Sequence, residues 1–430
     1  MDGAGPVSAR LRGGGRRSPS RGPCGGRPRP SPLAGGGGVG LPANAVSVSV
    51  NVLYLNPHGT IGGAERALIE LLGALDRARF VPLVVLGEDG PLAAELRLRG
   101  IEAVVEPFPS PPLYRLAWPP TLVRLARAAW RIGRLARVRG ARILHCGDVL
   151  GLMLLIAARP RAARLVYQLH YLGGVPRRMA LACLALPAVD RLLAVSSEQP
   201  SQLGPAPVLF ARRTSVVPPG IRARAFEGGN RCTLRDALGM ANATPLVGLV
   251  ARYDTWKGHH VFLEAAARIA SQRPEVRFAM VGGGLNGDPQ PHVGRYRDAV
   301  LARREQLTLE HCVAVLDHRH DVPAVLAGLD VLVCPSDHEP FGMIVLEALA
   351  AGTPVVASDS GGPAEILQHG RSGLLFATGD AAALAAAVLR VLDDPALRTC
   401  LAEGGRRRLQ SAFTSARYAR DVEAIYAALA

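Results

Sequence analysis

The chain has 430 residues, of which 49% are hydrophobic, so it is long enough for two domains with ordinary cores. Its formal net charge is +15, but aromatic residues make up only 5%. This argues against a general nucleic-acid-binding protein, which stacks bases on aromatic side chains, and the seven cysteines, scattered without a CxxC pair, favour reduced cytosolic thiols over a zinc site or disulfide framework.

The positive charge is concentrated in two segments, residues 1–44 with seven arginines and one acid, and residues 107–147 with eight arginines and no acid. The first segment is rich in glycine, proline and arginine and has no apolar run of the kind found in secretory signals. Such a composition cannot bury a core, so it predicts a disordered basic tail.

From residue 46 onward, strand-like apolar runs alternate with helical stretches. The run 46–56 leads through a glycine-bearing loop into a helix, as at the start of a doubly wound α/β domain. Further buried strands are predicted at 80–87, 141–147, 163–170 and 190–196. The apolar stretch 149–158 is too short to span a membrane, and it predicts a buried helix.

A helix is also predicted at residues 120–139. At about 100° per residue, one side carries Arg124, Arg127, Arg131 and Arg134. The opposite side carries Leu122, Leu125, Ala129, Ile132 and Ala136. A solvated basic face on a domain helix explains this pattern, and so does peripheral contact with anionic membrane, which attracts basic residues.

A second α/β series begins after residues 215–221. Its strands are predicted at 245–252, 276–284, 312–317, 330–336 and 353–359. Alternating strands and helices predict parallel sheets covered on both faces. The expected organisation is a tail at 1–44, a first doubly wound domain at 45–216, a second at 217–412, and a C-terminal helix at 413–430 for which packing on the first domain is one option.

Lys257 is the only lysine among 50 lysines and arginines. Arg252 and Lys257 follow the predicted strand 245–252, and ligands of doubly wound sheets bind beyond the carboxyl ends of strands. An arginine fork and a compact lysine charge together suit a diphosphate. The plain alternative is a surface lysine in a turn.

A second motif occupies residues 335–367. Glu339 precedes a predicted helix and Glu347 follows eight residues later on it, and carboxylates are good acceptors for vicinal hydroxyls. The Gly361-Gly362 loop precedes Pro363, a residue expected at the first position of a helix, whose free amides would bind phosphate oxygens.

The stretches RYDTWKG, at 252–258, and EPFGMIVLEALAAGTPVVASDSGG, at 339–362, resemble the family 4 glycosyltransferases, retaining enzymes of the GT-B fold. The similarity extends over roughly residues 48–428. It implies an α/β protein of two Rossmann-like doubly wound domains that face a central cleft. Nucleotide-sugar donor would bind mainly to the second domain, and the acceptor would be a glycan or a lipid-linked glycan in the cytoplasm or at the inner membrane face.

The resemblance also implies roles for individual residues. Arg252 and Lys257 would neutralise the donor diphosphate as it leaves, Glu347 would hold the ribose hydroxyls, and Glu339 would hold hydroxyls of the transferred sugar. The backbone of Phe341 and Gly342 would lie nearby. The remaining implied site residues are Gly62, Gly63, Gly361 and Gly362 at the phosphates, and His170 at the sugar or acceptor.

The implied reaction retains the anomeric configuration without an enzyme nucleophile, and it uses neither a metal nor another cofactor, since the sequence has no D-x-D motif. Departures from the family pattern are Ala251 for glycine, Pro219 for asparagine and Asp317 for glycine. Because Asp317 borders the expected base pocket, UDP and GDP both remain open. Three alternatives are a sugar-nucleotide epimerase, a PLP-dependent phosphorylase that would use Lys257, and a non-catalytic nucleotide-sugar-binding protein.

Overall fold

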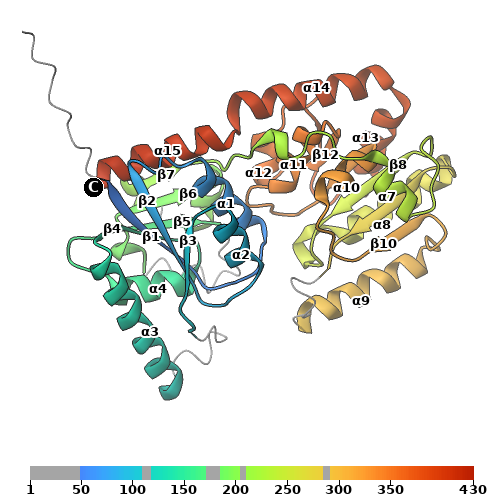
Figure 1. The fold of residues 1–430 in the computed structure, drawn as a ribbon. Coiled ribbons are helices and arrows are strands. Elements are labelled where there is room, and N and C mark those ends of the chain that lie inside the picture. Colours follow the sequence, from blue (N-terminus) through green and yellow to red (C-terminus); the bar gives the residue numbers. More distant parts are fainter. Residues whose placement is uncertain (1–48, 109–117, 171–184, 204–209, 284–290) are drawn as a thin grey trace, which may run out of the picture. The chain divides into compact units, whose positions relative to one another are not determined.

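A computed structural model describes residues 49–108, 118–170, 185–203, 210–283 and 291–430, so the predicted tail lies outside the described residues. Two parallel sheets organise this part of the chain, one of seven strands and one of six (Figure 1). The predicted α/β class with two doubly wound sheets is therefore confirmed.

The first sheet has the strand order β3-β2-β1-β4-β5-β6-β7. The strands are β1 (Val50–Asn56), β2 (Phe80–Leu86), β3 (Glu102–Val105), β4 (Ala141–Cys146), β5 (Arg164–Leu169), β6 (Arg191–Ala194) and β7 (Thr214–Val216). The chain winds outward from β1 to β3 and then returns to β4, beside β1, so the winding direction reverses between these two strands. Strands β3 and β7 were not predicted, because these short edge strands are only partly buried.

Helices cover both faces of this sheet. They are α1 (Gly63–Ala74), α2 (Pro91–Leu98), α3 (Pro119–Val138) and α4 (Val149–Ala158). One apolar core lies under α3 and α4, and another lies under α1 and α2. Short 3-10 helices, η2 (Leu186–Ala188), η3 (Gln199–Leu203) and η4 (Ala211–Arg213), follow in the chain.

The second sheet has the order β10-β9-β8-β11-β12-β13, with its reversal between β8 and β11. Its strands are β8 (Leu246–Val250), β9 (Arg277–Val281), β10 (Val313–Leu316), β11 (Val331–Cys334), β12 (Val355–Ser358) and β13 (Leu374–Phe376). The three-residue edge strand β13 was not predicted. In a doubly wound sheet the crevice at such a reversal is the usual ligand site, so β8 and β11 mark where to look.

The elements around this sheet begin with η5 (Ala223–Ala225), α7 (Arg231–Ala237) and η6 (Thr255–Lys257). The helices that follow are α8 (His259–Gln272), α9 (Pro291–Gln306), α10 (Val322–Gly328), α11 (Met343–Ala351), α12 (Gly361–Ile366), α13 (Ala381–Asp393) and α14 (Pro395–Ala412). Buried residues of α8 and α13 pack in one core of this half, and those of α10 and α11 pack in another.

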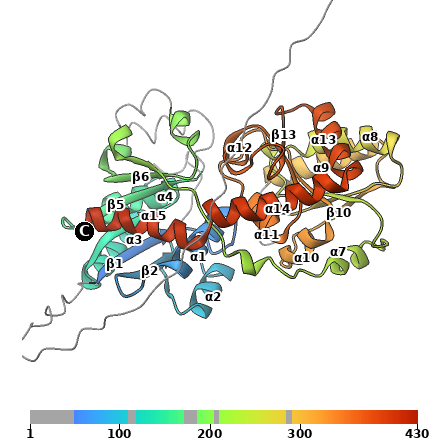
Figure 2. The same ribbon diagram turned by 90° about the horizontal axis from the view of Figure 1, so that it is seen from above.

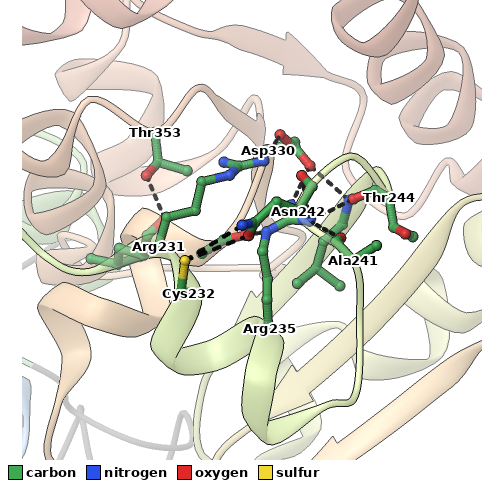
Figure 3. Close-up of polar contacts among 11 residues, drawn as sticks. Arg231, Cys232, Arg235, Ala241, Asn242, Thr244, Asp330 and Thr353 are labelled. Carbon is green, nitrogen blue, oxygen red and sulfur yellow. Dashed lines mark hydrogen bonds and ion pairs between the residues drawn. The ribbon is translucent and has the colours of Figure 1, made fainter.

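A buried arginine fixes α7 to the sheet (Figure 3). The Arg235 side chain is fully buried, and its guanidinium donates hydrogen bonds to the carbonyls of Gly328, Ala241, Asn242 and Thr244. It also donates to Asp330 Oδ2 at 2.8 Å, and the same carboxylate pairs with Arg231 at 2.7 Å. Each of the three guanidinium nitrogens thus has a partner, as burial of a charge requires.

The last helix, α15 (Ser415–Leu429), leaves the second half and packs on the first sheet (Figures 1 and 2). Tyr418 accepts a hydrogen bond from Gln168 Nε2 at 2.6 Å, and Tyr426 bonds both His145 and Tyr54. Where the chain crosses between the halves, the amide of Ile221 donates to the carbonyl of Phe413 at 2.9 Å. The two crossings therefore lie side by side.

Two local predictions were wrong. Leu122, expected on the buried side of α3, is 50% exposed, because the buried side is centred on Ala128, Ile132 and Ala136, further along the helix. Pro363 is the third residue of α12 and not the first, because the helix begins at Gly361 after the extended residue Ser360. In the described part of the chain, no helix combines the length and apolarity needed to cross a membrane.

Candidate functional site

The reversal between β8 and β11 brings Lys257 and Glu339 together. Lys257 follows β8 and Glu339 follows β11, the neighbouring parallel strand, so both side chains emerge at the same edge. Lys257 Nζ lies 2.6 Å from Glu339 Oε2, and Ser336 Oγ donates to the same oxygen at 2.9 Å. Both side chains are largely buried, with 15% and 9% exposed. A cation and a carboxylate therefore share one small, largely buried site.

A tight turn holds the lysine in place. The backbone of Gly258 is left-handed, with φ of 72°, and a Cβ there would lie 2.0 Å from the carbonyl oxygen of Pro335. Only glycine permits this approach of the lysine turn to the end of β11. Nζ also lies 3.9 Å from the centroid of the Trp256 ring, a cation–π contact that further orients the ammonium group.

Arg252 lies at the same strand end but is more open. It pairs with Asp254 at 3.4 Å, and about half of its side chain, 49%, is exposed. An exposed ion pair of this kind contributes little to the free energy of folding. The Arg252 guanidinium is therefore available to an anionic ligand. Phe341, in contrast, is buried, with its ring 6.0 Å from that of Phe413 and its backbone packed against Gly362.

Glu347 lies on α11, which begins after Gly342. Its side chain is 5% exposed, and its ion-pair partner is Arg66 of α1, at 3.7 Å. Burial raises the pKa of Glu347 to about 7, although the Arg66 charge opposes this rise. Sequence reasoning missed Arg66, whose only signal is that it directly follows the GGAE stretch at 62–65.

The two glycines that begin α12 also have protein partners. The amide of Gly361 donates to Glu198 Oε2 at 2.6 Å, and that of Gly362 donates to the carbonyl of Glu339 at 2.9 Å. Ser197 donates to the Glu365 carboxylate from both its amide and its hydroxyl, at 2.7 and 2.8 Å. A protein carboxylate thus lies where a donor phosphate oxygen was predicted. Glu198 carried no sequence signal of such a contact.

The predicted residues of the first half lie at strand ends of its sheet. Gly62 caps α1, and its amide donates to Glu65 Oε2 at 2.9 Å, while Gly63 is the first helical residue. His170 follows β5, and burial lowers its pKa to about 4, so the imidazole is neutral near pH 7. Within the described residues these three form no hydrogen bond with Lys257, Glu339 or Glu347.

A cavity of about 690 Å³ adjoins Glu347. Residues of both halves line it, among them Arg66, Glu70, Met343, His318 and His320. The two histidines belong to the loop after β10 that the sequence identified as the base side, and their rings are 4.9 Å apart. The cavity is large enough for a nucleoside, and of the predicted site residues only Glu347 lines it.

In this arrangement each acidic group already has a protein partner: Glu339 has Lys257, Glu347 has Arg66 and Glu198 has the Gly361 amide. A diphosphate and sugar hydroxyls offer the same kinds of bond, so a donor can exchange with these pairs. Among the described residues, no three His, Cys, Asp or Glu side chains are grouped closely enough to hold a metal ion.

Comparisons with known families cover most of the chain. The sequence model described as Glycosyl transferases group 1 matches residues 230–408, and that described as Glycosyltransferase Family 4 matches residues 61–224. A D-inositol 3-phosphate glycosyltransferase of Geodermatophilus obscurus is 35% identical over 251 residues, which are 56% of this chain and 53% of that protein. A glycogen synthase of Mycobacterium tuberculosis is 38% identical over 164 residues, or 38% of each chain. The chain thus spans about half the length, or less, of these curated relatives.

Solved structures match a larger share of the chain than these curated relatives do. Anabaena HepE in complex with UDP-glucose has a TM-score of 0.74 and 26% identity, covering 88% of this chain and 99% of that one. A sucrose-phosphate synthase of Thermosynechococcus elongatus, with a TM-score of 0.72 and 23% identity, covers 88% and 99%. These likenesses confirm the predicted two-domain GT-B fold.

Proposed function

Because the chain belongs to the group 1 glycosyltransferases, in family 4, we propose that it transfers a sugar from a nucleotide-diphosphate sugar to a hydroxyl acceptor, with retention at the anomeric carbon. The observation that carries this proposal is the contact of Lys257 with Glu339 at the reversal between β8 and β11. It joins a diphosphate-binding cation to a sugar-binding carboxylate at the edge where doubly wound sheets bind ligands.

UDP-glucose is the first donor to examine. HepE, at 25–26% identity, has been solved with UDP and with UDP-glucose, and this supports a uridine nucleotide here. In the proposed complex the base and ribose enter the cavity beside His318 and Glu347, and the ribose hydroxyls replace Arg66 as partners of that carboxylate. Lys257 and Arg252 bind the diphosphate, and Glu339 accepts hydrogen bonds from hydroxyls of the sugar.

The chemical step needs no enzyme nucleophile. The bond between C1 and the diphosphate oxygen breaks, and an acceptor oxygen bonds to C1 on the same face. The acceptor proton passes to the departing diphosphate, whose growing negative charge Lys257 and Arg252 stabilise. The backbone amides of Gly62, Gly63, Gly361 and Gly362 would turn to the phosphates. For this, Gly62, Gly361 and Gly362 would exchange their present acceptors, which are Glu65, Glu198 and the Glu339 carbonyl. His170, neutral near pH 7, positions the sugar or acceptor by hydrogen bonding and carries no charge.

The acceptor class we propose is a cell-surface or lipid-linked glycan, made by an enzyme that acts in the cytoplasm at the inner membrane face. Peripheral contact with anionic membrane through Arg124, Arg127, Arg131 and Arg134 belongs to this proposal. Relatives named D-inositol 3-phosphate glycosyltransferases make inositol phosphate a second acceptor to assay.

The donor is tested by thermal shift, because a ligand bound to the folded state raises the unfolding temperature. UDP-glucose should raise it more than GDP-glucose, and the enzyme should release UDP from UDP-glucose when inositol phosphate or a lipid-linked glycan is added. The anomeric proton coupling of the product, measured by NMR, should match that of the donor. No shift with any nucleotide sugar would contradict the donor site, and an inverted product would contradict retention.

Metal independence is tested separately. Activity should survive EDTA, since two cations and backbone amides neutralise the diphosphate in this proposal. Loss of activity on chelation, with recovery on adding Mn²⁺ or Mg²⁺, would contradict it. A new sugar nucleotide formed without acceptor would indicate the epimerase alternative, and a visible aldimine absorbance would indicate the phosphorylase.

A further inference from the structure

Exposed apolar side chains gather on one part of the first half. Nine large apolar side chains of the described residues are exposed, and six lie between residues 118 and 153. They are Trp118, Leu122, Val123, Trp130, Val138 and Met153. Single exposed apolar residues are ordinary, but a cluster of them with two tryptophans usually marks an interaction surface.

The geometry of α3 places three of these six residues on one side. At about 100° per residue, Leu122, Val123 and Trp130 lie within about 100° of one another around the helix axis. Arg127, Arg134 and Arg137 lie within about 60° of Trp130, whereas Arg124 and Arg131 lie about 100° or more from it. Leu122, Val123 and Trp130 therefore lie next to the side of α3 that carries Arg127, Arg134 and Arg137.

The arginines differ in their partners. Arg131 pairs with Glu106 at 2.5 Å, and its guanidinium also donates to the carbonyl of Pro107. Arg127, Arg134 and Arg137 form no ion pair with a described residue, and α3 itself contains no acid. The Arg134 guanidinium lies 6.0 Å from the centroid of the Trp130 ring. Three cations beside the tryptophan are thus available to an anionic partner.

A shallow hollow of about 300 Å³ lies beside Trp130 and is lined by residues of α3 and α4, two helices that neighbour each other in the fold (Figure 1). Small residues line it, including Ala126, Gly133 and Ala157, with Arg137 at its side. It exists because Gly133 brings the helices close: a Cβ there would lie 2.6 Å from the carbonyl oxygen of Ala158. An apolar recess beside an arginine fits part of an acyl chain next to its phosphate.

We propose that α3 and the adjoining side of α4 dock on an anionic lipid bilayer, with Trp118, Leu122, Val123 and Trp130 among the headgroups and acyl chains. Arg127, Arg134 and Arg137 bind the lipid phosphates. Interfacial helices combine these features, because tryptophan is both apolar and polar and arginine keeps its head in water while its stem is buried. This deepens the membrane contact in the proposed function, adding apolar insertion and replacing Arg124 and Arg131 by Arg137.

Tryptophan fluorescence tests the insertion directly. The chain has three tryptophans, at positions 118, 130 and 256, and the basic segment 1–44 has none, so that segment cannot produce the signal. With the full chain, vesicles of phosphatidylcholine and phosphatidylglycerol with brominated acyl chains should quench the emission. Trp118→Phe and Trp130→Phe should each remove part of the quenched signal, and Trp256→Phe should leave it. No quenching, or quenching that only Trp256→Phe removes, would overturn the proposal.

Matched charge variants test the orientation. Arg134→Gln with Arg137→Gln should weaken co-sedimentation with anionic vesicles by about 20-fold, since each basic residue near an anionic surface contributes roughly a factor of five. Arg124→Gln with Arg131→Gln removes the same charge from the other side of α3 and should have a much smaller effect. Equal losses in the two pairs would overturn the proposed orientation.

A second copy of the chain is the competing occupant. Sedimentation velocity without lipid should give one oligomeric state for the wild type and for Trp130→Ala. A wild-type dimer that Trp130→Ala dissociates, without any change in vesicle binding, would assign the surface to self-association and overturn the lipid proposal. UDP-glucose binding, measured in parallel, should be the same in all α3 variants, so that failure of the donor site is recognised independently.

Discussion

At the scale of single residues, the contrast between Lys257 and the 49 arginines has a physical basis. Arg235 uses its planar fork to satisfy several carbonyls in one buried network, which a lysine cannot do. Lys257 instead places one compact charge between a carboxylate and an indole ring, where a fork would not fit the same space. The composition singled out Lys257 and the structure supplies its partners, whereas its role in donor binding stays a prediction.

Lys257→Ala should lower the kcat/KM of sugar transfer by about 100-fold or more, because it removes a charge that stabilises the leaving diphosphate. Lys257→Arg should recover only part of this loss. The measurement is UDP release from UDP-glucose, with circular dichroism to show that the fold is kept. Arg268→Ala, on an exposed position of α8, is the control for loss of one positive charge. Full activity of Lys257→Ala would refute the donor-site assignment.

The raised pKa of Glu347 gives donor binding a pH dependence. With a pKa of about 7, this carboxyl is mostly protonated at pH 6 and mostly ionised at pH 8, and the ionised form is the better acceptor for ribose hydroxyls. UDP-glucose should therefore bind about tenfold more tightly at pH 8 than at pH 6. Calorimetry across this range measures the effect.

The matched variant is Glu347→Gln, which keeps the shape and should bind weakly at every pH. The diphosphate diester of the donor does not titrate in this range, and burial holds the pKa of His170 near 4. Neither group therefore produces the change in affinity between pH 6 and pH 8. Arg66 and Glu70 are the charged neighbours of Glu347. If Glu347→Gln shows the same change in UDP-glucose affinity between pH 6 and pH 8, another titrating group causes that change.

At the scale of elements, strands with a continuous buried apolar run could be predicted from the sequence to within a few residues. The missed strands β3, β7 and β13 are edge strands of three or four residues. Strands β3 and β7 are only partly buried, and β13, although mostly buried, has too few residues to form a recognisable pattern.

The candidate site was partly predictable for a related reason. Lys257 and Glu339 each follow a strand, but their contact depends on β8 pairing with β11, an order that local patterns do not contain. Arg66 and Glu198 meet their partners across long stretches of chain, 163 residues in the case of Glu198 and Gly361. No local pattern encodes such contacts.

The α7 network predicts a large stability effect. Arg235→Met should lower the free energy of unfolding by about 3 kcal/mol or more, because it leaves Asp330 and several carbonyls without their buried donor. Arg231→Met removes the other partner of the same carboxylate, but this arginine is 41% exposed, so about 1 kcal/mol or less is expected. Urea unfolding measures the free energy of unfolding of both variants. Equal losses would contradict the view that burial makes the Arg235 contacts the stronger ones.

At the scale of the whole molecule, α15 joins the end of the chain to the first sheet. Tyr426→Phe should weaken the first half by about 1–3 kcal/mol, because it leaves His145 and Tyr54 without their buried partner. Hydrogen exchange should show faster opening of β1 and β4 with β8 and β11 unchanged. Arg417→Gln, on the exposed side of α15, is the control and should change neither. Equal effects on both sheets would contradict a local role for α15.

The same helix sets an order of events during synthesis. The hydrogen bonds from α15 to the first sheet join residues up to 372 positions apart, so they cannot form until α15 has left the ribosome. At roughly 5–20 residues per second, the strands up to β7 wait about 10–40 s for their covering helix. Throughout that interval an apolar face of the nascent first sheet remains open to water and to chaperones. The half of the protein that is made first is thus the half that is completed last.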